Sequence, residues 1–279
     1  MSSNIGYLVL GSPRTGTNLL CHALRVSGQA GDPDEWYGLS RLHRTLRDWD
    51  LAHPESRPDA PQATDWAAYQ QRLLEKTGSG GRFGVKVFYY HVERLFRTKQ
   101  ISSPVELLPE GHRADVRVIL VARRDVVGQA VSMAIASRSG IFADVPGERF
   151  VPTATKVAWW REGPPPALVR DTDELTADAF DAAEIHQIVT AVRRHQDVWE
   201  QWLDSTRLPR VRVTYEDIVN RREDTLQAVF DVLGMPDRAS EYTNPGLRRQ
   251  ATSLNQEIAE RYREWLRGNP HAVDDARDL

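Results

Sequence analysis

A glycine-bounded loop between a predicted strand and a predicted helix is the feature that most constrains how this chain folds. The apolar segment 5–10 runs directly into Gly11, and Gly16 stands before residues 18–27, whose leucines and alanines recur at helical spacing. The loop and its exit contribute Ser12, Pro13, Arg14, Thr15, Thr17 and Asn18. Backbone N–H groups of such a loop, together with the helix dipole, attract an anion. The sequence therefore predicts a phosphate or sulfate site here; a plain turn with two glycines is the alternative.

This loop differs from the phosphate loops that bind nucleoside triphosphates. Those loops end in Gly-Lys-Ser/Thr, where the lysine contacts the β- and γ-phosphates and the hydroxyl binds magnesium. Here Thr17 and Asn18 follow Gly16, and the basic residue, Arg14, stands inside the loop. The pattern therefore favours an anion of lower charge that is handled without a metal ion.

Apolar strands alternate with helices along the rest of the chain. Apolar side chains alternate from Phe83 to Tyr89 and predict a strand over 82–89, whereas the continuous apolar run 116–122 is typical of a buried parallel strand. A further strand is predicted at 211–213, and helices are predicted at 39–48, 64–77, 126–137, 177–203, 223–233 and 257–267. This order predicts an α/β fold: one domain over residues 1–279, with a central parallel sheet flanked by helices and a P-loop-like phosphate-binding loop.

A second group of basic residues follows the predicted strand 116–122. Arg123 and Arg124 come directly after it, Asp125 is placed to cap the next helix, and that helix carries Ser132. Ligands of open α/β sheets bind at the carboxyl ends of the strands. Two anion sites at neighbouring strand ends would hold two phosphates of one nucleotide; a salt-bridged arginine pair on the surface is the alternative.

Composition limits the class of protein and of ligand. The chain has 279 residues, 41% of them hydrophobic and 27% charged, which excludes a disordered chain. The net charge of −3 argues against a nucleic-acid polymer as partner. Only four of the 36 basic residues are lysines. This bias either reflects a GC-rich genome or favours bidentate recognition of phosphate or sulfate by arginine.

Cysteine, histidine and hydropathy patterns give further limits. The single cysteine, Cys21, excludes an internal disulfide and a cysteine-built zinc site, and the histidines lack metal-ligand spacing, so we expect no metal. No run approaches the roughly 20 apolar residues of a membrane helix, and the N-terminus lacks the pattern of a signal peptide. The sequence predicts a cytoplasmic protein without a membrane span.

The two basic motifs resemble those of the sulfotransferases that use 3′-phosphoadenosine 5′-phosphosulfate (PAPS). Residues 12–20 look like the 5′-phosphosulfate loop of that family, and residues 123–132 look like its 3′-phosphate motif. The chain is similar above all to the bacterial trehalose 2-sulfotransferase family, whose other marks recur in order at 7–10, 31–37, 83–86, 213–215 and 249–251. The resemblance covers residues 7 to about 265.

The resemblance implies a reaction and roles for named residues. PAPS would give its sulfuryl group to a hydroxyl of a carbohydrate or glycosylated small molecule, leaving PAP as product, with no metal. Arg14 and the loop would bind the leaving 5′-phosphate, and Lys86 would contact the sulfuryl group or the acceptor. Glu35 would be the base, with His91 as the alternative base. Further expected ligands are Ser132 with Arg123 or Arg124 at the 3′-phosphate, Arg249 over the nucleotide, and Trp36, Tyr37 and His91 at the acceptor.

Some features depart from the family or leave alternatives open. The loop has Thr-Gly-Thr-Asn where the family usually has Ser-Gly-Ser-Thr or similar, and Arg124 stands where proline is usual, so Arg123 and Arg124 both remain candidates. The Pro- and Trp-rich stretch around 137–176 is expected to be a lid or an acceptor-selecting insertion. Dimers occur in the family, so a homodimer is one expectation. The alternatives to a sulfotransferase are a P-loop-type kinase and a nucleotide-binding protein without this activity.

Overall fold

The computed structural model describes residues 4–145, 148–150, 160, 169, 175–235 and 253–272. The chain divides into two compact units, and each is described by itself. The first unit consists of Met1–Ala122 and Trp199–Pro245, and the second consists of Arg123–Val198 and Gly246–Leu279.

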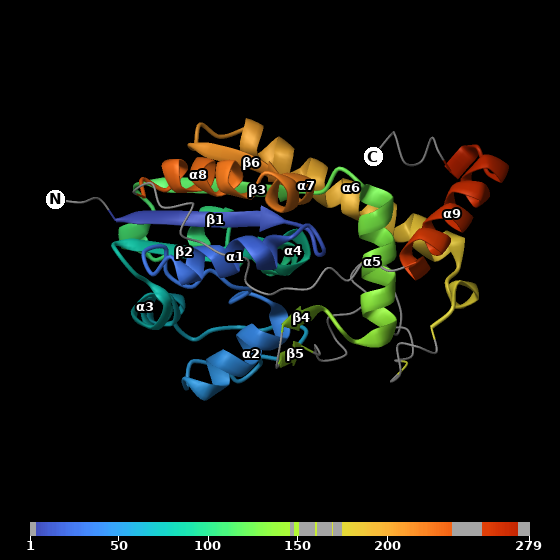
Figure 1. The fold of residues 1–279 in the computed structure, drawn as a ribbon. Coiled ribbons are helices and arrows are strands. Elements are labelled where there is room, and N and C mark those ends of the chain that lie inside the picture. Colours follow the sequence, from blue (N-terminus) through green and yellow to red (C-terminus); the bar gives the residue numbers. More distant parts are fainter. Residues whose placement is uncertain are drawn as a thin grey trace. The chain divides into compact units, whose positions relative to one another are not determined.

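A four-stranded parallel sheet lies at the centre of the first unit (Figure 1). Its strands, in spatial order, are β2 (Arg82–Phe88), β1 (Ile5–Gly11), β3 (Val116–Ala122) and β6 (Arg210–Thr214). The register pairs Val9 of β1 with Lys86 of β2 on one side and with Ile119 of β3 on the other. Strand β1 is buried along its whole length, as a parallel strand covered on both faces should be.

Helices cover both faces of this sheet. They are α1 (Thr17–Val26), α2 (Leu39–Asp48), α3 (Trp66–Thr77), α4 (Tyr89–Arg97), α7 (Tyr215–Asn220) and α8 (Arg222–Val232), with the short 3-10 helices η1 (Pro104–Leu107) and η2 (Glu110–His112). Successive residues of β1 enter different cores, because side chains of a strand alternate between faces. Leu8 and Leu10 pack with α2, α3 and α4, whereas Tyr7 and Val9 pack with α1 and α8.

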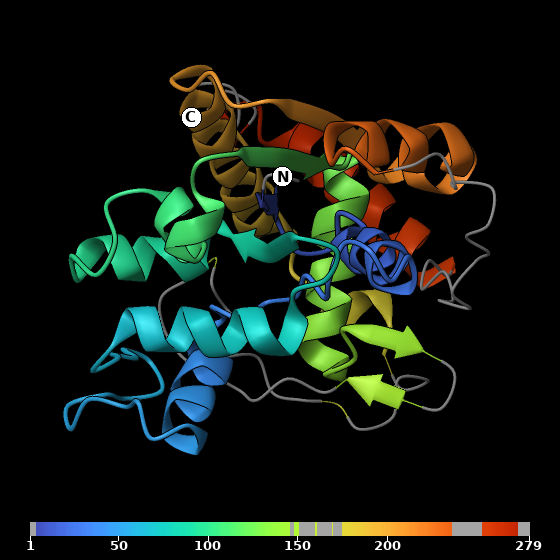
Figure 2. The same cartoon turned by 90° about the vertical axis from the view of Figure 1, so that its left-hand side faces the viewer.

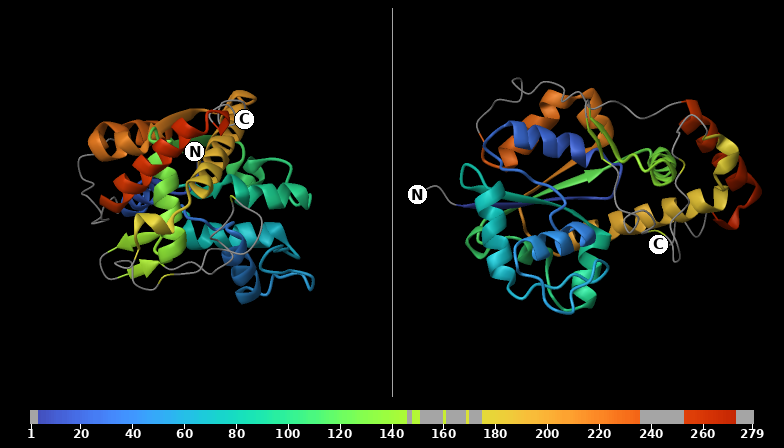
Figure 3. Two further views of the ribbon diagram at one scale, coloured as in Figure 1. Left: turned by 90° about the vertical axis from the view of Figure 1, so that its right-hand side faces the viewer. Right: turned by 90° about the horizontal axis from the view of Figure 1, so that it is seen from below.

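The figures show the same arrangement in this unit. In the right-hand view of Figure 3, α1 and α8 lie on one side of the strands and α2 and α3 lie on the other. Figure 2 shows α2 and α3 next to each other. The structure therefore confirms the predicted α/β fold, with a central parallel sheet flanked by helices.

The second unit is mainly helical. Its elements are α5 (Val126–Ser139), the hairpin of β4 (Ala143–Val145) and β5 (Glu148–Phe150), the 3-10 helix η5 (Ala177–Ala179), most of α6 (Ala182–Asp204) and α9 (Ser253–Gly268). Its core joins the long helices: Val131 of α5, Val189 of α6 and Tyr262 of α9 are all buried in one cluster. Arg138 of α5 also forms an ion pair with Glu184 of α6.

Two predicted elements differ clearly from those observed, and helix α7 was not predicted. The strand predicted over 82–89 ends at Phe88, and helix α4, which was not predicted, begins at Tyr89. The alternating apolar pattern continues to Tyr89 and so does not indicate that a helix begins there. Val92 and Leu95 become buried only once the chain is helical. The helix predicted over 177–203 is interrupted: Asp181 accepts a hydrogen bond from the Ala183 amide and begins α6 after the separate η5.

The stretch around 137–176 stays largely a prediction. The structure describes the end of α5, the β4–β5 hairpin and a few single residues of it, and the remainder lies outside the described residues. Among the residues that are described, no helix is both long enough and apolar enough to cross a membrane.

Candidate functional site

The loop after β1 has the backbone geometry of an anion cradle. Gly16, the residue before α1, has φ +84°, and Arg14 inside the loop also lies in the left-handed region at φ +69°. A Cβ at Gly11 would stand 2.8 Å from the Val121 carbonyl oxygen, so only glycine fits beside β3 at this point. Inside the loop, the Thr15 hydroxyl donates to the Ser12 carbonyl oxygen at 2.8 Å.

The N-terminus of α1 is suited to hold a negatively charged group. No side chain caps its first turn, and that turn contains no acidic residue. Its N–H groups and the positive end of the helix dipole therefore face the loop without a competing carboxylate in that turn. Trp199 fixes the start of the loop, since its indole N–H donates to the Gly11 carbonyl oxygen at 3.1 Å. The predicted loop residues are thus brought together: Ser12, Pro13, Thr15 and Thr17 are buried, and Arg14 and Gly16 are half-buried.

A second segment, residues 31–38, is tied to α3 and to the edge strand β2, and the residue before it is tied to β1. The Tyr7 hydroxyl donates to the Ala30 carbonyl oxygen at 2.8 Å, and the Asp32 amide donates to the Thr77 carbonyl oxygen at 2.8 Å. The Lys86 amide of β2 donates to the Asp34 carbonyl oxygen at 3.1 Å. These bonds hold the acidic residues of the segment against the middle of β2.

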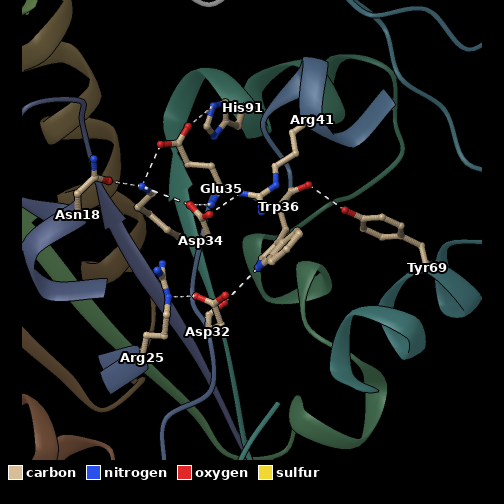
Figure 4. Close-up of polar contacts among 10 residues, drawn as sticks. Asn18, Arg25, Asp32, Asp34, Glu35, Trp36, Arg41, Tyr69 and His91 are labelled. Carbon is tan, nitrogen blue, oxygen red and sulfur yellow. Dashed lines mark hydrogen bonds and ion pairs between the residues drawn. The ribbon is translucent and has the colours of Figure 1, made fainter. Parts of the chain in front are cut away.

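A cluster of charged and polar side chains lies where this segment meets β2 and α1 (Figure 4). At its centre is Lys86, whose side chain is only 3% exposed. Its Nζ lies 2.6 Å from Asn18 Oδ1, 3.0 Å from Glu35 Oε1 and 3.7 Å from Asp34 Oδ1. The structure therefore joins three predicted site residues, Asn18, Glu35 and Lys86, which are far apart in the sequence. We call Lys86, Asn18, Asp34 and Glu35 the Lys86 cluster.

Lys86 and Asp34 shift each other's proton affinities. Burial alone would lower the pKa of Lys86, but the negative charges of Glu35 and Asp34 outweigh burial and hold this pKa above its usual value. Burial alone would raise the pKa of Asp34, but Lys86 and Arg41 hold it well below its usual range. Both groups are therefore charged near neutral pH.

Arg41 and His91 each lie next to one carboxylate of the cluster. Arg41 donates to Asp34 Oδ2 at 2.5 Å, and its guanidinium lies over the Trp36 ring, 3.7 Å from the ring centre. The ring of His91 is buried, with Nε2 3.7 Å from Glu35 Oε2. The carboxylate that was predicted as the base thus lies between a lysine and the histidine that was predicted as the alternative base.

Trp36 and Tyr37 are placed mainly by the protein itself. The Trp36 indole donates to the Asp32 carbonyl oxygen at 3.1 Å, and the Trp36 carbonyl oxygen accepts from the Tyr69 hydroxyl at 2.8 Å. Tyr37 is fully buried, and its hydroxyl donates to the Leu107 carbonyl oxygen at 2.6 Å. Both side chains fix the segment that carries Glu35, and their predicted contact with the acceptor stays a prediction.

The second basic motif opens the second unit. Asp125 caps α5 by accepting from the Gly128 amide at 2.8 Å, and it lies 3.7 Å from an Arg123 guanidinium nitrogen. A Cβ at Gly128 would stand 2.0 Å from Asp125 Oδ2, so this glycine makes room for the cap. Arg123 is 14% exposed, whereas Arg124 is exposed and Ser132 is half-buried.

Arg249, the remaining predicted site residue, lies outside the described residues. Within the part of the chain that the structure describes, no group of three or more His, Cys, Asp or Glu side chains is arranged to hold a metal ion. Asp34 and Arg41 were not among the predicted site residues. The position of Asp34 beside Glu35 could have indicated its role, but nothing in the local sequence shows that Arg41 contacts Asp34.

Comparison with known proteins places the chain in a family. A sequence model described as "Stf0 sulphotransferase" matches residues 6–265. The chain belongs to this family. It is therefore a sulfotransferase, an enzyme that transfers a sulfuryl group, as the sequence predicted.

Two relatives match this Stf0 family member over nearly their whole length. Trehalose 2-sulfotransferase of Mycolicibacterium smegmatis is 27% identical over 278 residues, which cover 92% of this chain and 94% of that protein. Trehalose 2-sulfotransferase of Mycobacterium tuberculosis is 24% identical, with the same two coverages. A solved sulfotransferase domain from the curacin biosynthetic pathway is 14% identical, covers 92% of this chain and 83% of that one, and superimposes with a TM-score of 0.47.

Proposed function

We propose that this enzyme transfers the sulfuryl group of PAPS to a hydroxyl of a carbohydrate or of a glycosylated small molecule. The observation that carries the proposal is the Lys86 cluster, in which one ammonium group contacts both a residue of the anion cradle and a carboxylate: Nζ lies 2.6 Å from Asn18 Oδ1 and 3.0 Å from Glu35 Oε1. A transfer of this kind needs a cation at the migrating group and a base at the attacking hydroxyl. The names of the two relatives support a sugar as acceptor.

The loop fits the donor's leaving group. Sulfuryl transfer resembles phosphoryl transfer, with in-line attack and negative charge spread over the peripheral oxygens. The first-turn N–H groups of α1 and the Arg14 guanidinium would bind the oxygens of the 5′-phosphate, where charge builds up as the sulfur–oxygen bond breaks. Glycines at both ends of the loop allow this close approach, and no carboxylate in the first turn of α1 opposes it.

Glu35 would act as the base, and Lys86 would be the cation at the sulfuryl group. Glu35 takes the proton of the acceptor hydroxyl while that oxygen forms its bond to sulfur, and the sulfur–oxygen bond to the 5′-phosphate breaks, leaving PAP. Lys86 stabilises the sulfuryl oxygens during the transfer. It is suited to this role because its neighbours keep it protonated and its burial keeps it in place. His91 would support Glu35 from the opposite oxygen.

Other ligands of the nucleotide and of the acceptor follow from the sequence motifs. Arg123 or Arg124, together with Ser132, would bind the 3′-phosphate, and Arg249 would cover the nucleotide. Trp36 and Tyr37 are proposed neighbours of the acceptor, and residues around 137–176 are proposed to select it as a lid or insertion of a single sulfotransferase domain. A cytoplasmic location and a homodimer stay predictions.

Ligand-induced stabilisation tests the donor. The melting temperature is measured with PAP, with ATP and magnesium, and without ligand. We expect PAP to raise it, since a ligand at 100 times its Kd adds about 2.7 kcal/mol to the free energy of unfolding. Stabilisation by ATP and magnesium alone would instead favour a kinase. Sulfuryl transfer from labelled PAPS to a panel of mono- and disaccharides then tests the acceptor, and transfer only to non-sugar hydroxyls would contradict the carbohydrate assignment.

A further inference from the structure

We propose that Asn18 is a positioning residue whose side-chain oxygen keeps the Lys86 ammonium group on the phosphate-loop side of Glu35. The inference rests on the proposed function, because it concerns the cation and the base of that reaction. It gives Asn18 a role through Lys86, where the sequence motif alone assigns it only to the nucleotide.

The contact between Asn18 and Lys86 is the shortest in the cluster. Nζ is 2.6 Å from Asn18 Oδ1, compared with 3.0 Å from Glu35 Oε1. Asn18 is an exposed residue of the first turn of α1, whereas Lys86 is almost completely buried in the edge strand β2. An exposed amide can exchange its partner for water at little cost, but a buried ammonium group cannot. Lys86 is therefore the group that depends on this bond.

The three partners of Lys86 exert unequal forces on it. An ammonium group has three N–H donors, and Asn18 and Glu35 both lie at hydrogen-bond distance from Nζ. Asp34 Oδ1, at 3.7 Å, adds a second negative charge from the same segment as Glu35. Coulomb attraction thus draws the ammonium group towards the two carboxylates, and the neutral oxygen of Asn18 holds it towards α1.

Loss of the Asn18 oxygen would let Lys86 move to the carboxylates. The cation would then leave the side on which the sulfuryl group is transferred, and its closer pairing with Glu35 would make that carboxylate a weaker base. Both changes lower the rate of transfer. Neither requires any change in how the loop itself binds the 5′-phosphate.

The groups around Glu35 determine how its basicity responds to a movement of Lys86. Among the described residues, the titratable groups near Glu35 include Lys86 of β2, Asp34 of its own segment, His91 and Tyr90 of α4, and Cys21 of α1. Burial raises the pKa of Cys21 to about 12 and that of Tyr90 above its usual value, so both stay neutral in the working range. Of these groups, only Lys86 forms a hydrogen bond with Asn18.

Isosteric substitutions of Asn18 test the proposal in the full-length enzyme. Asn18→Leu keeps the shape and removes the oxygen, whereas Asn18→Asp keeps an oxygen at the same place. We expect Asn18→Leu to lower kcat about tenfold, the rate equivalent of one hydrogen bond to a charged group, and to move the acid limb of the kcat–pH profile to lower pH. Asn18→Asp should recover much of kcat but raise KM for PAPS, because it adds a negative charge to the cradle.

A control variant and a contrary result complete the kinetic test. Gln71→Leu removes an exposed amide from α3, where its partner is Glu75, and should leave both kcat and the pH profile unchanged. If Asn18→Leu leaves kcat and the acid limb where they were, or if the leucine and aspartate variants lose kcat equally, Asn18 does not position Lys86.

A spectroscopic test separates this proposal from the proposed function. The chain has only four lysines, so ¹⁵N-lysine NMR gives few ammonium signals, and Lys86→Arg identifies the one from Lys86. We expect Asn18→Leu to shift the Lys86 signal or speed its hydrogen exchange, and Gln71→Leu to leave it unchanged. An unchanged signal in Asn18→Leu overturns the proposal. This result does not depend on PAPS turnover, so an enzyme that fails to use PAPS would refute the proposed function alone.

Discussion

The glycine-bounded loop before α1 and the Lys86 cluster share the start of that helix but are built by opposite means. The loop from Gly11 to Thr17 is made of backbone: glycines with the required space and φ, and N–H groups at a helix start. The Lys86 cluster is made of side chains from α1, β2 and the segment 31–38, and it holds charges that are largely buried. A backbone site is determined locally, whereas a side-chain site depends on several elements and on the balance of charges within it.

Because the loop is proposed to bind the donor and the Lys86 cluster to carry the base, we expect a substitution in the cluster to lower kcat without changing the affinity for PAP. Glu35→Gln keeps the size of the side chain but removes the proposed base. We expect kcat to fall by about 10²- to 10⁴-fold, the usual contribution of a general base, while the Kd for PAP changes little. Steady-state kinetics and calorimetric titration with PAP give the two numbers. Glu75→Gln, at an exposed position of α3, serves as the control. A parallel loss of PAP affinity in Glu35→Gln would show that Glu35 belongs to the binding site instead.

Removal of the central cation should damage the cluster more than the loop. Lys86→Met fills the same space but leaves Asp34 and Glu35 without their buried partner, and such a loss typically costs about 3 kcal/mol of unfolding free energy. Urea denaturation with Lys99→Met as the exposed counterpart measures it. A variant as stable as the wild type would mean that the two carboxylates do not need Lys86 in the folded state.

The loop should instead respond to a change in backbone conformation. Gly16→Ala places a Cβ at φ +84° and 3.0 Å from the Tyr215 ring, so we expect a loss of about 1–2 kcal/mol in stability and weaker PAP binding. Gly28→Ala is the matched control, because Gly28 has φ +67° but open space around its Cβ position. Denaturation and PAP titration of both variants separate strain from crowding. If Gly16→Ala and Gly28→Ala change PAP binding equally, the loop does not bind the nucleotide as proposed.

The last prediction concerns stability in acid. The pKa of Asp34 is lower in the folded than in the unfolded chain, so its ionised form stabilises the fold above the unfolded value of about 3.9. This stabilisation is lost as the pH falls below that value towards the folded pKa. Asp34→Asn should therefore flatten the fall in unfolding free energy below about pH 4, and the exposed Asp48→Asn serves as the control for the loss of one carboxylate. Identical acid limbs for Asp34→Asn and the wild type would contradict the pairing with Lys86 and Arg41.

The difference between the two regions also explains what could be predicted. The loop, the alternation of strands and helices, and the helices over 39–48 and 64–77 follow from local patterns and agree with the structure. Helix α4 was missed because Tyr89 continues the alternation of β2, and only packing of Val92 and Leu95 favours a helix there. The structure brings the predicted site residues Asn18, Glu35 and Lys86 together, but the sequence did not predict their contacts with one another.

The sequence by itself determined the parallel α/β fold, the glycine-bounded loop between β1 and α1, and membership of a sulfotransferase family, because each is recorded in local patterns along the chain. Only the tertiary structure decided that a lysine of β2, an asparagine of α1 and two carboxylates of the segment 31–38 meet within 3.7 Å. It also decided that Arg41 donates to Asp34 and lies over the Trp36 ring. The physical reason is that burial removes the water that would otherwise screen these charges, so their interaction depends on distances that only the folded chain sets.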